Sequence, residues 1–169
     1  NAITPAPGAA QNLGLSIALS RALNEWQVAE WTEKESRLKA SIVVPYEDGA
    51  SAAKEIDHWG GNPHFVQVLM MSRTADPMGQ RRYWPIYEAA VRNNLPIGIH
   101  AFGYGGFPVT GSGWPSYYIE EMSGHSQCCQ ALLASMVLDG VFEAFPTLKI
   151  VLIESGFAWL PPMAWRLDN

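Results

Sequence analysis

The sequence predicts an α/β fold with parallel strands, and three observations support this. Short apolar runs alternate with longer segments of helical periodicity, an order that is typical of parallel sheets. The runs are apolar almost throughout, as expected for strands covered on both faces. A complete (β/α)8 barrel needs about 250 residues, and this chain of 169 residues supplies roughly half of its strands. An open doubly wound sheet and a partial barrel both fit this pattern.

Residues 1–11 are rich in Pro, Ala and Gly and are predicted to be an irregular lead-in to one domain over residues 12–169. The predicted helices have apolar residues at steps of three and four: 12–37, 49–59, 81–94, 125–145 and 156–169. The predicted strands are short apolar runs ended by glycine, proline or polar residues: 39–46, 64–71, 95–100 and 148–154.

The connection over residues 101–124 is about twice the usual length, and such loops are commonly functional. It contains six aromatic residues, which favours an ordered loop over a cleft: Phe102, Tyr104, Phe107, Trp114, Tyr117 and Tyr118.

Composition excludes several classes of protein. The chain is 48% hydrophobic and 16% charged, which is sufficient for one globular core. A net charge of −5 without a basic patch argues against nucleic acid and anionic membranes as partners. No apolar run approaches the roughly 18 residues of a membrane helix. The two adjacent cysteines exclude a disulfide scaffold, so we expect a cytoplasmic protein.

Two candidate functional residues end predicted strands, where α/β proteins place their active sites. His100 ends one strand and is a candidate metal ligand or general base, or a structural histidine bonded to a loop carbonyl. Glu154 ends another and could bind a metal, accept a proton or hold a loop amide. Ser72 and Arg73 end a third. His125, expected at a helix start, is either functional or part of the packing there.

Other motifs disfavour two further functions. The glycines of residues 103–107 match neither a phosphate-binding loop nor G-x-G-x-x-G, which argues against a nucleotide-binding domain. No G-x-S-x-G motif is present, so an α/β-hydrolase nucleophile is not expected.

Four stretches together resemble the amidohydrolase-related family of metal-dependent hydrolases and decarboxylases: 82–90, 95–100, 113–118, and 140–143 with 153–161. The resemblance implies strands three to six of a distorted (β/α)8 barrel with a divalent metal, usually zinc. His100 matches the histidine ligand of the fifth strand. Glu154 stands where the decarboxylase branch has a histidine, so the resemblance favours a hydrolase acting on a small carboxylated or aromatic substrate.

The resemblance also implies roles for the remaining candidates. Glu154 would orient a water or carry its proton, and His125 would contact the substrate or a ligand. Trp114, Tyr117 and Tyr118 would form the pocket wall. The family's His-x-His pair is missing, so we expect an incomplete fragment that is inactive and nearly metal-free by itself. The alternatives are a non-oxidative decarboxylase, or a non-catalytic α/β module that forms homo-oligomers through open sheet edges.

Overall fold

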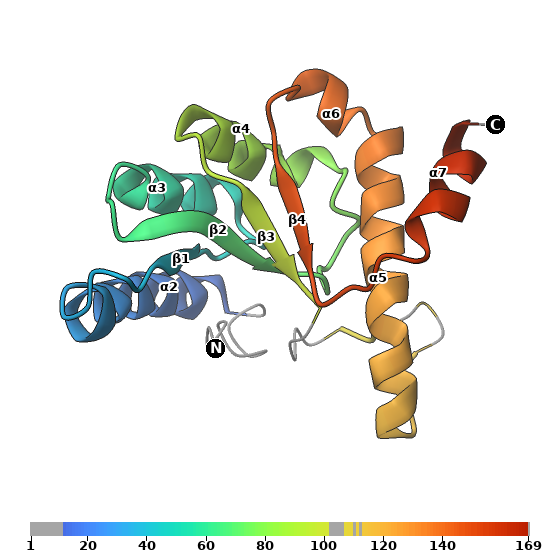
Figure 1. Cartoon of the computed structure of the whole chain (residues 1–169), viewed down its shortest axis with the longest axis horizontal. Coiled ribbons are helices and arrows are strands. Elements are labelled where there is room, and N and C mark those ends of the chain that lie inside the picture. The colour runs from blue at the N-terminus through green and yellow to red at the C-terminus, as the bar shows by residue number, and fades with distance from the viewer. Residues whose placement is uncertain (1–11, 102–106, 110, 112, 169) are drawn as a thin grey trace.

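Four parallel strands form one sheet in the order β1-β2-β3-β4 (Figure 1). The computed structural model describes residues 12–101, 107–109, 111 and 113–168. The predicted lead-in, residues 1–11, lies outside the described residues. The strands are β1 Ala40–Val43, β2 Phe65–Met71, β3 Ile97–His100 and β4 Ile150–Ile153. All four predicted strands are confirmed.

The strand order decides between the two architectures. Each strand pairs with the next one along the chain. A doubly wound sheet reverses its order at a switch point, whereas consecutive strands of a barrel are neighbours. The fold is therefore a stretch of a (β/α) barrel. Met71 pairs with His100, and His100 pairs with Ile153, so the C-terminal ends of β2, β3 and β4 lie side by side at one end of the sheet.

Helices connect the strands in alternation with them. They are α2 Leu13–Gln27 (continued by a π-helical turn, Val28–Thr32), α3 Gly49–Trp59, α4 Trp84–Arg92 (preceded by a 3-10 turn, Arg81–Tyr83), α5 Tyr118–Leu138, α6 Val141–Ala144 and α7 Leu160–Asp168. None of the described helices is long and apolar enough to span a membrane.

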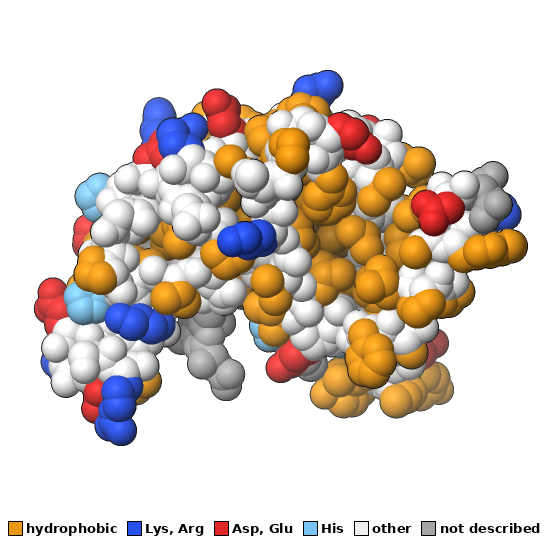
Figure 2. Space-filling model, turned by 45° about the horizontal axis from the view of Figure 1, so that its top comes forward, with side chains coloured by type: hydrophobic (Ala, Val, Ile, Leu, Met, Phe, Trp, Pro, Cys, Tyr) orange, Lys and Arg blue, Asp and Glu red, His pale blue; other side chains and the backbone are white. Residues whose placement is uncertain are grey.

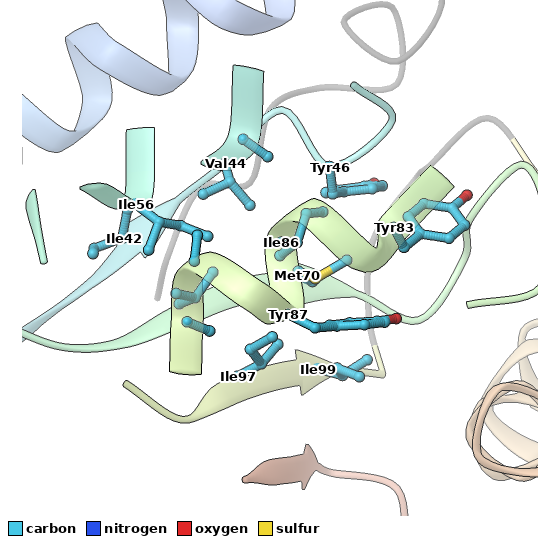
Figure 3. Close-up of a cluster of buried hydrophobic side chains, with 14 of the residues drawn as sticks. Ile42, Val44, Tyr46, Ile56, Met70, Tyr83, Ile86, Tyr87, Ile97 and Ile99 are labelled. Atoms are coloured by element: carbon cyan, nitrogen blue, oxygen red, sulfur yellow. The ribbon is translucent and has the colours of Figure 1, made fainter. Parts of the chain in front are cut away.

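The central core lies between the sheet and helices α3 and α4 (Figure 3). Alternate residues of the strands point into it, because side chains of a strand alternate between faces. Its fully buried members include Ile42, Val44, Ile56, Met70, Tyr83, Ile86, Tyr87, Ile97 and Ile99. Burial of each large apolar side chain contributes about 1.5–3 kcal/mol to the free energy of unfolding.

Helix α2 has a buried face that is polar. Ser16, Ser20 and Asn24 are buried, whereas Leu15 and Trp26, which helped to predict the helix, are 47% and 46% exposed. The physical reason is that this face lies along the outer edge of β1, where backbone groups need hydrogen-bond partners. The apolar pattern thus predicted the helix but did not identify its buried face.

Helix α5 differs from its expected boundaries at both ends. It begins at Tyr118 rather than at His125, because the Glu120 carboxylate accepts hydrogen bonds from the backbone N–H groups of Ser116 and Tyr117, both at 2.7 Å. It ends at Leu138, since Gly140 has a φ of 74° and separates it from α6. His125 therefore lies inside the helix, and the preceding loop is shorter than expected.

Hydrophobic side chains gather on the side of the molecule formed by α5, β4 and α7 (Figure 2). Phe157 and Trp165 are 85% and 68% exposed. β4 has no described strand beside its outer edge. The two edges of the sheet are therefore different, since side chains of α2 bond to the outer edge of β1.

Candidate active site

The C-terminal ends of β3 and β4 bring His100 and Glu154 together. The Nε2 atom of His100 lies 3.8 Å from Oε2 of Glu154. Their side chains are 29% and 55% exposed, so both groups remain accessible. The parallel register produces this proximity, because His100 is paired with Ile153, the residue before Glu154. An imidazole and a carboxylate at this separation can share a proton or contact the same ligand.

Glu154 occupies an unusual backbone conformation. Its φ is 60°, a region that residues other than glycine rarely adopt and that often marks functional sites. The turn is held in place by Trp159, whose Nε1 donates to the Ser155 carbonyl at 2.8 Å. This conformation directs the chain from the strand end into a tight turn, with the carboxylate at the sheet edge.

One face of α5 lies against the guanidinium of Arg73, which follows the end of β2. Glu121, His125 and Cys128 are spaced three and four residues apart, so they share this face. Arg73 Nη2 donates to Glu121 Oε1 at 2.6 Å. The same guanidinium influences the pKa values of His125 and Cys128. The first half of α5 therefore covers the strand ends.

His125 is buried, with 4% of its surface exposed. Burial and then the positive charge of Arg73 lower the pKa of His125, although the Glu121 and Glu154 carboxylates act in the opposite direction. Burial and Arg73 thus favour the neutral imidazole, which has one donor and one acceptor nitrogen, and a hydrogen bond to the backbone of Ala101 engages the ring.

The predicted aromatic wall lies apart from this cluster. Trp114 lines a surface pocket with Ile119 and Ser123, which project from the opposite face of α5 to His125. Tyr117 and Tyr118 are 72% and 74% exposed. Contact of these three aromatic residues with substrate stays a prediction.

The described residues do not complete a metal site. Within this part of the chain, no three His, Cys, Asp or Glu side chains are grouped closely enough to hold an ion. His100 and Glu154 form a pair, whereas a catalytic zinc site normally has three protein ligands. His100 can thus serve as one ligand of a larger set.

No motif in the sequence indicates a role for Arg73 or Glu121. The position of Arg73 just after a predicted strand is the one feature of the sequence that could identify it as a site residue. Glu121 lies 48 residues away along the chain, and only the packing of α5 over the sheet brings the two together.

Comparison with known proteins identifies the family. The sequence profile described as Amidohydrolase matches residues 2–169. The chain belongs to the amidohydrolase family. This confirms the resemblance noted in the sequence. A gamma-resorcylate decarboxylase of Rhizobium radiobacter is 25% identical to it over 98% of this chain and 52% of its own length.

Solved structures agree with this fold. An amidohydrolase of Mycobacterium avium superposes with a TM-score of 0.79 at 22% identity, over 95% of this chain and 44% of that one. The 5-carboxyvanillate decarboxylase of Novosphingobium aromaticivorans gives a TM-score of 0.73 at 21% identity, over 97% and 47%. That enzyme was solved with manganese and 4-hydroxy-3-methoxy-5-nitrobenzoic acid, so the expectation of zinc is not supported.

The chain spans about half the length of the curated relatives it matches. The four strands of the described sheet, half of the eight in a complete barrel, agree with that coverage.

Proposed function

We propose that the whole protein to which this chain belongs is a metal-dependent, non-oxidative decarboxylase of a small aromatic acid. The observation that carries the proposal is the approach of His100 to within 3.8 Å of Glu154 at the strand ends of a chain that matches gamma-resorcylate decarboxylases. The hydrolase expected from the sequence has less support, because the named relatives are decarboxylases.

The reaction exchanges a carboxyl group for a proton without a redox step. The bond between the ring carbon and the carboxylate breaks, CO2 leaves, and a proton from a general acid forms the new C–H bond. Glu154 is accessible at the strand end and is the group that we assign to carry this proton. His125, neutral and buried, orients a substrate hydroxyl through one of its ring nitrogens.

His100 is assigned as one ligand of the divalent ion. A manganese ion held there would supply a Lewis acid for the substrate oxygens. The role of the chain itself is to hold His100 by the pairing of β3 with β2 and β4. The part of the chain that the structure describes holds no group of three possible ligands, so this assignment requires further ligands from other residues.

The test uses the whole protein, loaded with Mn²⁺ and given 2,6-dihydroxybenzoate or 5-carboxyvanillate. Release of CO2 and appearance of the decarboxylated phenol are expected from the wild type. His100→Ala should lower turnover at least about 100-fold and reduce the bound metal together with it. His58→Ala, an exposed histidine of α3, is the matched control and should retain both. Unchanged metal content and turnover in His100→Ala would remove the ligand assignment.

A further inference from the structure

Arg73 is a buried cation with spare hydrogen-bonding capacity. Only 2% of its side chain is exposed, although it lies two residues beyond Met71, the end of β2. Its Nη2 is bonded to Glu121, but its Nε has no hydrogen-bond partner among the described residues. A buried donor without a partner is costly, and such groups in native proteins commonly have a functional explanation.

The surroundings of Arg73 place this spare donor within the candidate site. Met71, two residues earlier, is paired with His100 across the sheet. On the other side, His125 is close enough for the charge of Arg73 to lower its pKa. Arg73 therefore lies two residues beyond the strand end that pairs with His100, and its guanidinium is bonded to α5 through Glu121.

We propose that Arg73 is the anchor for an anionic oxygen pair of the substrate, namely the carboxylate of an aromatic acid. The identity of the ligand, an aromatic acid, rests on the proposed function. The presence of an anion site at Arg73 does not. The planar guanidinium presents donors in a fixed fork that matches a carboxylate, which an ammonium group does not. The Nε–H group supplies the unused donor of that fork.

Glu121 has a defined place in this arrangement. Its side chain is 24% exposed and neutralises Arg73 through one contact at 2.6 Å. Because Glu121 projects from the first turn of α5 toward the same guanidinium, an incoming carboxylate competes with it for the cation. Glu121 thus offsets the charge of Arg73, and an anion binds only as strongly as it can compete with this carboxylate.

The experiment follows the Arg73 Nε–H signal directly. The ¹⁵N-labelled chain is titrated with 2,6-dihydroxybenzoate, and the arginine Nε–H region of its ¹H–¹⁵N spectrum is recorded. The Arg73 signal is assigned by its disappearance in Arg73→Lys. It is expected to shift with 2,6-dihydroxybenzoate and to stay in place with resorcinol, which has the same ring and hydroxyls but no carboxylate.

Two variants and one control complete the test. Arg73→Lys keeps the charge but loses the fork, and should weaken binding of 2,6-dihydroxybenzoate at least about 10-fold. Glu121→Gln removes the competing charge and should tighten binding several-fold, a result that does not depend on the folding of the Arg73 variant. Arg92→Lys, on the exposed end of α4, should leave binding unchanged.

Three results would overturn the anchor: an equal shift with resorcinol, an equal shift with inorganic phosphate, or unaltered affinity in Glu121→Gln. Turnover distinguishes this failure from failure of the proposed function. If the whole protein releases CO2 and Arg73→Lys leaves KM unchanged, Arg73 does not anchor the substrate, but the protein is still a decarboxylase. If 2,6-dihydroxybenzoate binds through Arg73 but the whole protein releases no CO2, the anion site is supported and the proposed decarboxylase function fails.

Discussion

The side-chain amide of Asn24 pairs with both backbone groups of Val43. Its Nδ2 donates to the Val43 carbonyl at 2.9 Å, and its Oδ1 accepts from the Val43 N–H at 2.8 Å. Gln27 adds a bond to the Ser41 carbonyl at 3.2 Å. Together they occupy the outer edge of β1 as a neighbouring strand would, and so protect it from pairing with other chains.

Asn24→Ala should therefore destabilise the fold and expose this edge. Loss of the partners of two buried backbone groups is expected to lower the free energy of unfolding by about 2 kcal/mol. Urea denaturation measures the change, and Glu25→Ala, an exposed neighbour in α2, serves as the control. A variant as stable as the control and equally resistant to aggregation would show that the edge does not depend on Asn24.

The packing of α5 over the sheet depends on Gly79. A Cβ atom there would lie 2.2 Å from the Ser135 carbonyl oxygen, a backbone atom of α5. Gly79→Ala should consequently destabilise the protein by about 1–3 kcal/mol, because the helix must shift. At Gly61 a Cβ meets nothing within 4 Å, so Gly61→Ala should have little effect on the same denaturation curve. Similar midpoints for the two variants would contradict this contact.

The sequence predicted the strands well because their apolar runs report burial directly. The places of His100 and Glu154 at strand ends made them candidate site residues; the structure brings them within 3.8 Å, and their roles stay predictions. The start of α5 was missed since residues 118–124 lack an apolar stripe and the helix is capped by Glu120. The Arg73–Glu121 pair depends on tertiary packing that no local pattern records.

The lowered pKa of His125 predicts a dependence of stability on pH. Burial and Arg73 disfavour its charged form, with Glu121 and Glu154 opposing them. The unfolded state, with a pKa of about 6.5, then binds a proton more readily than the native state. Stability is therefore complete above about pH 6.5 and falls as the pH decreases below that value.

Melting temperatures between pH 5 and pH 8 test this linkage. The melting temperature of the wild type should decrease more on acidification than that of His125→Gln, because glutamine cannot take up the proton. Parallel curves for the two proteins would show that His125 has the same pKa in both states.

The cysteines should be unreactive in the native state. Burial raises the pKa of Cys129 to about 11, and also raises that of Cys128, whose thiol donates to the Val109 carbonyl. Since the thiolate is the nucleophile, neither should be modified by a disulfide reagent at pH 8 until denaturant is added. Rapid reaction of a native thiol would indicate that the face of α5 opens.

Deuterium incorporation tests the central claim most directly. The whole protein with Mn²⁺ is given 2,6-dihydroxybenzoate in D2O, and the product is analysed by mass spectrometry and NMR. The account predicts CO2 and resorcinol with one deuterium at the carbon that lost the carboxylate, formed much more slowly by Glu154→Gln. Absence of CO2, or a product that retains every carbon of its substrate, would contradict the assignment of His100 and Glu154 to the active site of a decarboxylase.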